Sequence, residues 1–157
     1  MTIKIGEKHL SQYLDEAVQR YNTPDFIPND PLSIPHRFGL LQDREITGFW
    51  TATLAWGQRK TIIQSANRLV ELMDGAPYDF IVNHVEEDRA RFLDFKHRNF
   101  QATDTLWFLE FLQQFYRKNQ SLEHAFARHL QPGDTNVEPA LTGFHRDFFD
   151  HPYAPQR

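Results

Sequence analysis

The residues with the clearest capacity for chemistry lie in one short run, Trp56-Gly57-Gln58-Arg59-Lys60. Gly57 lets other groups approach the backbone closely, and Gln58 carries a hydrogen-bond donor and an acceptor without charge. Arg59 and Lys60 fall in the first turn of a predicted helix, where the helix dipole disfavours cations unless an anion such as phosphate is bound. The run therefore predicts either a phosphate-binding junction between two helices or a tight turn with solvated charges.

Two further runs, 35–38 and 95–100, combine a His-Arg pair with aromatic residues. An arginine fork can hold a phosphate, and it can equally pair with an acidic neighbour at a helix end. We include Arg37, from the first run, among the possible phosphate contacts. The candidate nucleic-acid-binding residues are therefore Gln58, Arg59, Lys60 and Arg37.

A metal-dependent hydrolase is a further hypothesis, with His145, Asp147 and His151 as its candidate residues. Asp147 and His151 are four positions apart and can share a helix face. His145 fits that face poorly, and the sequence contains no His-Glu-x-x-His pair. Surface histidines near a helix end explain these residues equally well. We therefore assign no metal ligand and expect no cofactor.

The composition restricts the classes of protein. A length of 157 residues predicts a single helical domain, residues 1–157. The absence of cysteine excludes disulfides, thiolate metal sites and a cysteine nucleophile from this chain. A net charge of −4 counts against nucleic-acid binding unless positive charge is local or lies on further sequence. With no signal peptide and no membrane-spanning run, we expect a cytoplasmic protein without a membrane partner.

Hydrophobic periodicity predicts an all-α fold, a compact multi-helix bundle with a Pro-rich extended segment. The first helix covers about residues 7–22. The Pro-rich segment, residues 24–42, then interrupts the helical pattern, and its expected anchors are Phe26, Ile27, Leu32 and Ile34. Asp43 is the predicted N-cap of the next helix. That helix and its successor are expected to form a helical hairpin that turns near Gly57.

The second half is predicted to contain the most apolar helix. It covers residues 104–119, with Thr103 as its cap, and its apolar residues occupy more than one face. Such a helix lies at the centre of a core or meets partners on two sides. Shorter helices are expected within residues 77–95, after Ser121 and after Pro139.

Four runs carry a family resemblance: DFIPNDPLSIPHRF, QDREITGFWTATLAWGQRKTII, LMDGAPYDF and FKHRNF. They resemble an uncharacterised, mainly bacterial family known only as a domain of unknown function. The resemblance extends from about Leu14 to Arg157. Members of that family are typically longer, so the chain resembles their N-terminal portion. The resemblance therefore implies a further partner, the missing C-terminal half of the same protein.

At a greater distance, the family is similar to the helix-hairpin-helix DNA glycosylases, the superfamily that includes the endonuclease III type. There a glutamine at a helix junction fills the gap left by a flipped base, and residues 53–61 resemble that junction with Gln58 as the wedge. Trp56-Gly57 stands where small residues are usual. The resemblance implies a DNA-repair-related protein that binds duplex DNA at a damaged or abasic site. No catalytic residue can be named, and the catalytic part is expected outside this chain.

A non-enzymatic helical scaffold or protein-interaction domain is the alternative to DNA binding. In that hypothesis, the apolar helix 104–119 supplies a face for a protein partner. The Gln-Arg-Lys and Pro-His-Arg-Phe runs then have structural roles only. A large contiguous apolar patch without basic surface beside it would favour this alternative.

Overall fold

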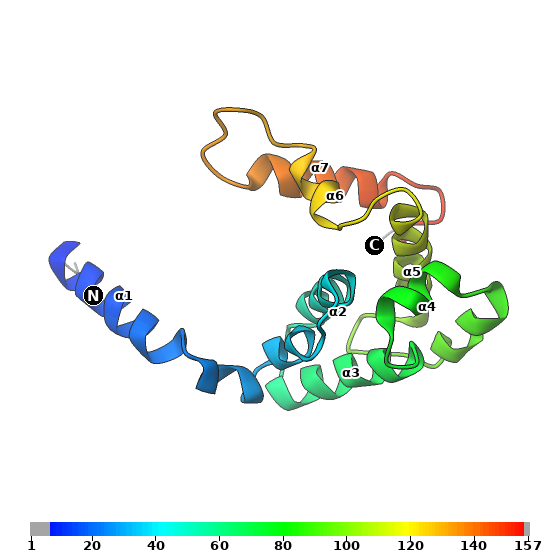
Figure 1. The fold of residues 1–157 in the computed structure, drawn as a ribbon, viewed down its shortest axis with the longest axis horizontal. Helices are drawn as coiled ribbons and strands as arrows, with labels where there is room; N and C mark the ends of the chain where they lie inside the picture. The colour runs from blue at the N-terminus through cyan, green and yellow to red at the C-terminus, as the bar shows by residue number, and fades with distance from the viewer. Residues whose placement is uncertain (1–6, 156–157) are drawn as a thin grey trace.

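The computed structural model describes residues 7–155, and in this range the protein is all-α, as predicted (Figure 1). The α-helices are α1 (Glu7–Tyr21), α2 (Leu41–Thr53), α3 (Arg59–Leu72), α4 (Pro77–Asn83), α5 (Ala102–Tyr116), α6 (Glu123–Ala127) and α7 (Glu138–Phe149). The 3-10 helices are η1 (Pro24–Asn29), η2 (Pro31–Ser33), η3 (Pro35–Arg37) and η4 (Glu86–Phe92). Within the described range, none of these helices has the length and apolar character needed to span a bilayer.

The Pro-rich segment coils into η1, η2 and η3, although an extended conformation is predicted for it. Proline explains the difference, because its fixed φ suits the first position of a helical turn, where its missing N–H is not needed. One proline begins each of the three turns. η2 and η3 pack against α2, and η2 also packs against α3. Ile34 anchors the segment at 2% exposure, whereas Leu32, another expected anchor, remains 48% exposed.

Two helices begin earlier than their predicted caps. Asp43 falls in the first turn of α2, where its carboxylate accepts a hydrogen bond from the backbone N–H of Tyr78 at 2.8 Å. Thr103 falls in the first turn of α5, and the carboxylate of Asp104 accepts a hydrogen bond from the N–H of Gln101 at 2.6 Å. A carboxylate is favourable throughout the first turn of a helix, so the sequence pattern places such residues only approximately.

Glu45 of α2 connects three helices. Its carboxylate accepts hydrogen bonds from the hydroxyls of Tyr116 and Ser121 and from the backbone N–H of Leu122. Burial and the nearby charge of Glu45 raise the pKa of the Tyr116 phenol above its ordinary value, so the phenol keeps its proton and donates. Ser121, which is predicted to open a helix, precedes α6 and accepts a hydrogen bond from the N–H of Glu123.

The core forms around α5. Trp50 of α2 and Phe148 of α7 pack on Phe108 of α5, with ring centres 4.8 Å and 5.0 Å apart respectively. Aromatic rings bury large apolar areas, and this burial is the main favourable term in folding. α5 is therefore central to the core, which is one of the two arrangements that its apolar faces predict. Its buried apolar residues are Trp107, Phe108, Leu109, Leu112, Phe115 and Tyr116.

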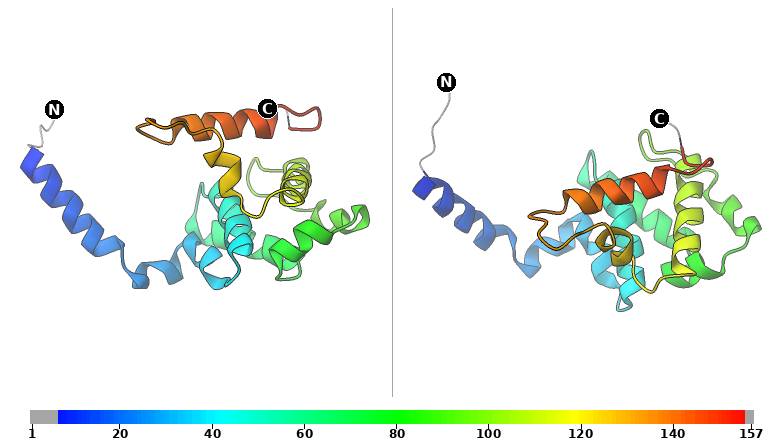
Figure 2. Two further views of the ribbon diagram at one scale, coloured as in Figure 1. Left: turned by 45° about the horizontal axis from the view of Figure 1, so that its top comes forward. Right: turned by 90° about the horizontal axis from the view of Figure 1, so that it is seen from above.

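α1 projects away from the other helices (Figures 1 and 2). The predicted amphipathic helix is present, but its apolar stripe is not buried. Ala17 of the stripe is partly exposed, and its large apolar residues are each at least 44% exposed: Leu10, Tyr13, Leu14, Val18 and Tyr21. The periodicity thus predicts the helix correctly and does not determine what covers it.

α6 and α7 pack against each other near the C-terminal end of the described chain (Figure 2). The rings of Phe126 and Phe144 stack across this contact with centres 4.2 Å apart. The imidazole of His129 lies directly against Gly143 of α7, and a Cβ at that position would overlap the ring. The close approach of α7 to the segment that follows α6 therefore depends on a residue without a side chain.

Candidate functional site

The predicted helix junction is a tight turn between α2 and α3. α2 is followed by Leu54, whose side chain is fully buried, and the N–H of Trp56 bonds to the carbonyl of Leu54 at 2.7 Å. Gly57 has a φ of +118°, a conformation that other residues rarely adopt. Gln58 is the N-cap of α3. The turn is therefore anchored in the core at one end and begins a helix at the other.

Arg98 packs on this turn from the loop that precedes α5. Its guanidinium carbon lies 4.5 Å from the centre of the Trp56 ring, and a Cβ at Gly57 would overlap the Arg98 side chain. Trp56 is 50% exposed, and Arg98 is also exposed. Such a cation–π contact contributes about 0.5–1 kcal/mol at an exposed site. The turn thus presents an aromatic ring and a cation side by side.

Arg98 has a positive φ of +58°, which is uncommon for a residue with a side chain. Residues held in such conformations occur preferentially at functional sites. Arg98 is not among the four candidates that the sequence provides. The relevant pattern is nevertheless visible in the sequence, because Arg98 belongs to the second His-Arg pair with flanking aromatics.

Gln58 and Lys60 both lie at the surface of the turn. Gln58 makes no side-chain capping bond to α3, and within residues 7–155 neither side chain has a hydrogen bond or an ion pair. The first backbone N–H groups of a helix have no acceptor within that helix, and no side chain caps those of α3. The structure therefore brings together an uncharged amide, a cation and free backbone donors.

Arg59 has a different environment from Lys60. Its Nε lies 3.7 Å from a carboxylate oxygen of Asp30, and its guanidinium carbon is 5.8 Å from the ring centre of Phe26. Both of these partners belong to the Pro-rich segment. Because the Arg59 side chain is still 57% exposed, a second partner can reach it. Arg59 therefore joins α3 to the Pro-rich segment as well as facing solvent.

Arg37 is not brought to the turn by any contact in the described residues. It ends η3, and its guanidinium lies 5.9 Å from the ring centre of its neighbour Phe38. The other three candidates, Gln58, Arg59 and Lys60, are consecutive and lie together at the start of α3. Arg37 and these three residues thus lie in two separate surface regions.

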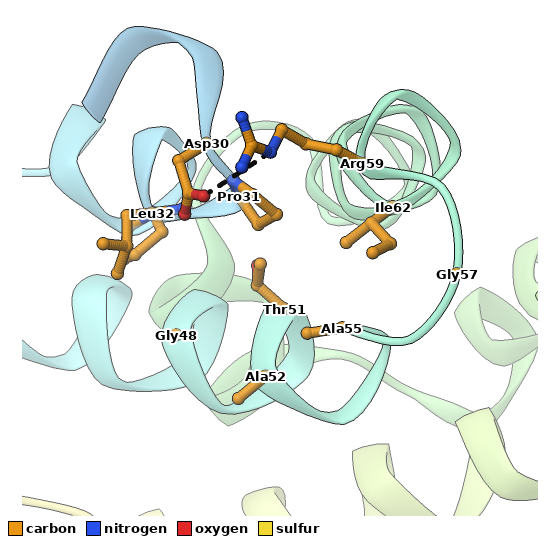
Figure 3. A pocket seen from close by; sticks show the side chains of 11 residues that line it. Asp30, Pro31, Leu32, Gly48, Thr51, Ala52, Ala55, Gly57, Arg59 and Ile62 are labelled. Atoms are coloured by element: carbon orange, nitrogen blue, oxygen red, sulfur yellow. Dashed lines mark hydrogen bonds and ion pairs between the residues drawn. The ribbon is translucent and has the colours of Figure 1, made fainter. Parts of the chain in front are cut away.

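A pocket of about 380 Å³ lies between the Pro-rich segment, α2 and the turn (Figure 3). Its walls are mainly apolar, and Asp30 and Arg59 face each other at its edge. The carboxylate of Asp30 also accepts a hydrogen bond from the N–H of Leu32 at 3.1 Å. The ion pair connects the Pro-rich segment to α3, and the hydrogen bond holds Asp30 within the segment. The lining residues are Asp30, Pro31, Leu32, Pro35, Gly48, Thr51, Ala52, Ala55, Gly57, Arg59 and Ile62.

The three candidate metal ligands do not converge. Asp147 accepts hydrogen bonds from Arg128 and from His129 Nε2, each at 2.6 Å. Desolvation favours the neutral acid, but these two partners outweigh it and keep the pKa of Asp147 below its ordinary value. His145 packs on a neighbouring ring of its own helix, while His151 packs on Trp107. No group of three potential ligands that could hold a metal ion occurs among residues 7–155.

The fold and the turn define an all-α protein in which α2 and α3 are joined by a polar and aromatic turn. The two helices cross each other steeply (Figure 3), so they do not form the antiparallel hairpin that the sequence predicts. Residues 30–157 match the model of the family described as "Protein of unknown function (DUF2400)", and the chain belongs to this family. The matched region begins at Asp30, so it includes the turn, Arg59 and its partner on the Pro-rich segment. Neither a curated protein nor a solved structure matches the chain.

Proposed function

We propose that this protein binds duplex DNA at a damaged or abasic site, in the manner of a DNA glycosylase-like protein, with Gln58 as the wedge. The observation that carries the proposal is the position of Gln58 at the surface of the turn between α2 and α3. Its side chain is exposed and, within the described residues, not engaged by any other group. No catalytic residue is assigned, and the proposal concerns recognition only.

A wedge side chain must enter the base stack without bending away. Leu54 anchors the turn in the core, and Arg98 packs on Gly57. An uncharged amide suits the gap left by a missing base, because it can donate and accept hydrogen bonds there. Trp56 adds an exposed aromatic face on which an unpaired base can stack.

Phosphate contacts would come from the groups around the wedge. Lys60, Arg98 and the exposed part of Arg59 are positively charged, and the first N–H groups of α3 point in the direction that favours anions. Because the whole chain carries a net charge of −4, binding must depend on this local charge. Arg37 would contact DNA only if the duplex extends across the Pro-rich segment.

The test compares two labelled duplexes, one intact and one with a single abasic-site analogue, by fluorescence anisotropy at several salt concentrations. We expect the protein to prefer the abasic duplex, and Gln58→Ala to reduce that preference about tenfold, or ~1.4 kcal/mol. Gln19→Ala, which removes an exposed glutamine from α1, is the matched control. An unchanged preference in Gln58→Ala would exclude the wedge role, and equal affinity of the wild type for both duplexes would exclude the recognition of damage.

A protein-interaction role is a second candidate, and one observation favours it. The helix that sequence reasoning proposes as the partner face, α5, is buried in the core. The exposed apolar stripe lies on α1 instead. Removing this stripe with Leu14→Glu and Val18→Glu leaves the turn unchanged, so DNA binding that survives these substitutions would separate the two functions. A loss of self-association or of partner binding, measured by analytical ultracentrifugation, would support the interaction role.

A further inference from the structure

The loop that carries Arg98 also borders a second hollow, which is lined mainly by polar and charged residues. This hollow has a volume of about 240 Å³ and lies between α3 and residues 94–96. Two arginines and one lysine line it, and one aspartate lies among them. The full set of lining residues is Gln64, Ser65, Arg68, Leu72, Arg91, Asp94, Phe95 and Lys96.

His97 fixes this loop against α3. Its ring is 3% exposed, and its Nδ1 lies 2.8 Å from the hydroxyl oxygen of Ser65. Its Nε2 is buried and has no hydrogen-bond partner among the described residues. With the ring proton on Nδ1, the ring donates to Ser65, and the buried Nε2 is then an acceptor and not an N–H without a partner. The Ser65 hydroxyl proton is then left to donate into the hollow.

The charges around the hollow differ in how far they are neutralised. Arg91 is paired with Asp74 at 2.7 Å and with Asp88 at 2.9 Å, so it contributes little free positive charge. Arg68 has only a 3.5 Å contact with Glu71, and both side chains are more than 60% exposed. An ion pair of this kind is worth little and exchanges easily for a better partner.

Lys96 is exposed and has no ion pair within residues 7–155. With Arg68 and the Ser65 hydroxyl it gives the hollow two available cations and a neutral donor. Asp94 is the acidic group that opposes them. A phosphate group matches this set, because it accepts several hydrogen bonds at once and carries negative charge.

We propose that this hollow is a phosphate site, occupied in the complex by the backbone of the strand that meets the Gln58 turn. Lys60 and Arg68 are eight positions apart on α3, which corresponds to about 12 Å along the helix. Each strand of B-DNA has one phosphate per about 3.4 Å of the duplex axis, so this length measured along that axis corresponds to about three to four phosphates. Arg98 beside the turn and Lys96 beside the hollow belong to the same loop and add two further cations.

This inference rests on the proposed DNA binding, so the experiment must separate the two. The affinity of the 157-residue chain for the abasic duplex is measured from 50 to 200 mM salt for the wild type and for Lys96→Ala and Arg68→Gln. Each lost phosphate contact should reduce the slope of log K against log salt by about 0.9. Lys118→Ala and Arg20→Gln remove exposed cations from other elements and serve as matched controls.

Slopes reduced in the two site variants and unchanged in the controls would support the phosphate site. Wild-type slopes in Lys96→Ala and Arg68→Gln would overturn it, even if the protein binds DNA. If the wild type binds no duplex, the proposed function fails, and titration with sodium pyrophosphate followed by NMR decides the site. Saturable shifts of the amide signals of residues 65 and 96 in the wild type, absent from the double variant Lys96→Ala/Arg68→Gln, would support the phosphate site. If the wild type shows no such shifts, the phosphate site is overturned.

Discussion

The structure predicts that alanine at Gly57 is harmful for two separable reasons, backbone strain and overlap with Arg98. A residue with a side chain held at the φ of Gly57 costs about 1–3 kcal/mol. The new Cβ would also displace the Arg98 guanidinium from the Trp56 ring, a contact worth about 0.5–1 kcal/mol. Gly57→Ala should therefore lower the free energy of unfolding by about 1.5–4 kcal/mol.

Two other glycines separate these contributions. Gly133 has a φ of +104°, but nothing lies within 4 Å of where a Cβ would be. Gly133→Ala should therefore have the cost of backbone strain without a cost from overlap. Gly39 has neither a φ in this range nor a neighbour within 4 Å, so Gly39→Ala should be neutral or should stabilise by about 0.4–1 kcal/mol. The expected order of destabilisation is Gly57→Ala, then Gly133→Ala, then Gly39→Ala.

Urea denaturation followed by tryptophan fluorescence measures these differences, because the chain contains three tryptophans. In an Arg98→Ala background, Gly57→Ala should lose the part of its cost that comes from overlap and then resemble Gly133→Ala. The account of the turn would be refuted if Gly57→Ala were no more destabilising than Gly39→Ala. A cost that persists unchanged without Arg98 would refute the packing of Arg98 on the turn.

Two further predictions concern the buried residues His84 and Gly143. Desolvation lowers the pKa of His84 from its ordinary value of 6.5, and the nearby charge of Arg89 acts in the same direction. His84 therefore contributes stability that is present above pH 6.5 and is lost as the pH falls toward its lowered folded pKa. Urea unfolding at pH 7.5 and 5.5 should show a larger loss for the wild type than for His84→Asn, and equal losses would contradict this. Gly143→Ala should lower the free energy of unfolding by about 1–3 kcal/mol, because the new Cβ would overlap the His129 ring. Replacing an exposed glycine of a helix by alanine usually stabilises by up to about 1 kcal/mol, and such a result at Gly143 would contradict the packing against His129.

The helices were predictable because their periodicity is local. Residues three and four positions apart share a face of any helix, so α2, α3 and α5 can be located without knowledge of their partners. The run from Trp56 to Lys60 was likewise visible as a junction, since glycine and a change of pattern mark the end of one helix and the start of the next. The predicted helix caps were less accurate: Asp43 is the third residue of α2 and Thr103 the second of α5, because polar residues mark a helix start only to within about one turn.

The surroundings of each site residue depend on contacts between distant parts of the chain. Nothing local in the sequence indicates that Arg98 packs on a turn 41 positions earlier, or that Asp30 reaches Arg59. The same holds for α1, whose periodicity does not reveal that its apolar stripe remains exposed. The sequence by itself determined the helical elements, the polar junction and the candidates Gln58, Arg59 and Lys60. The tertiary structure alone decided which charges are paired, which are free and which side chains meet, because these depend on the packing of helices against each other.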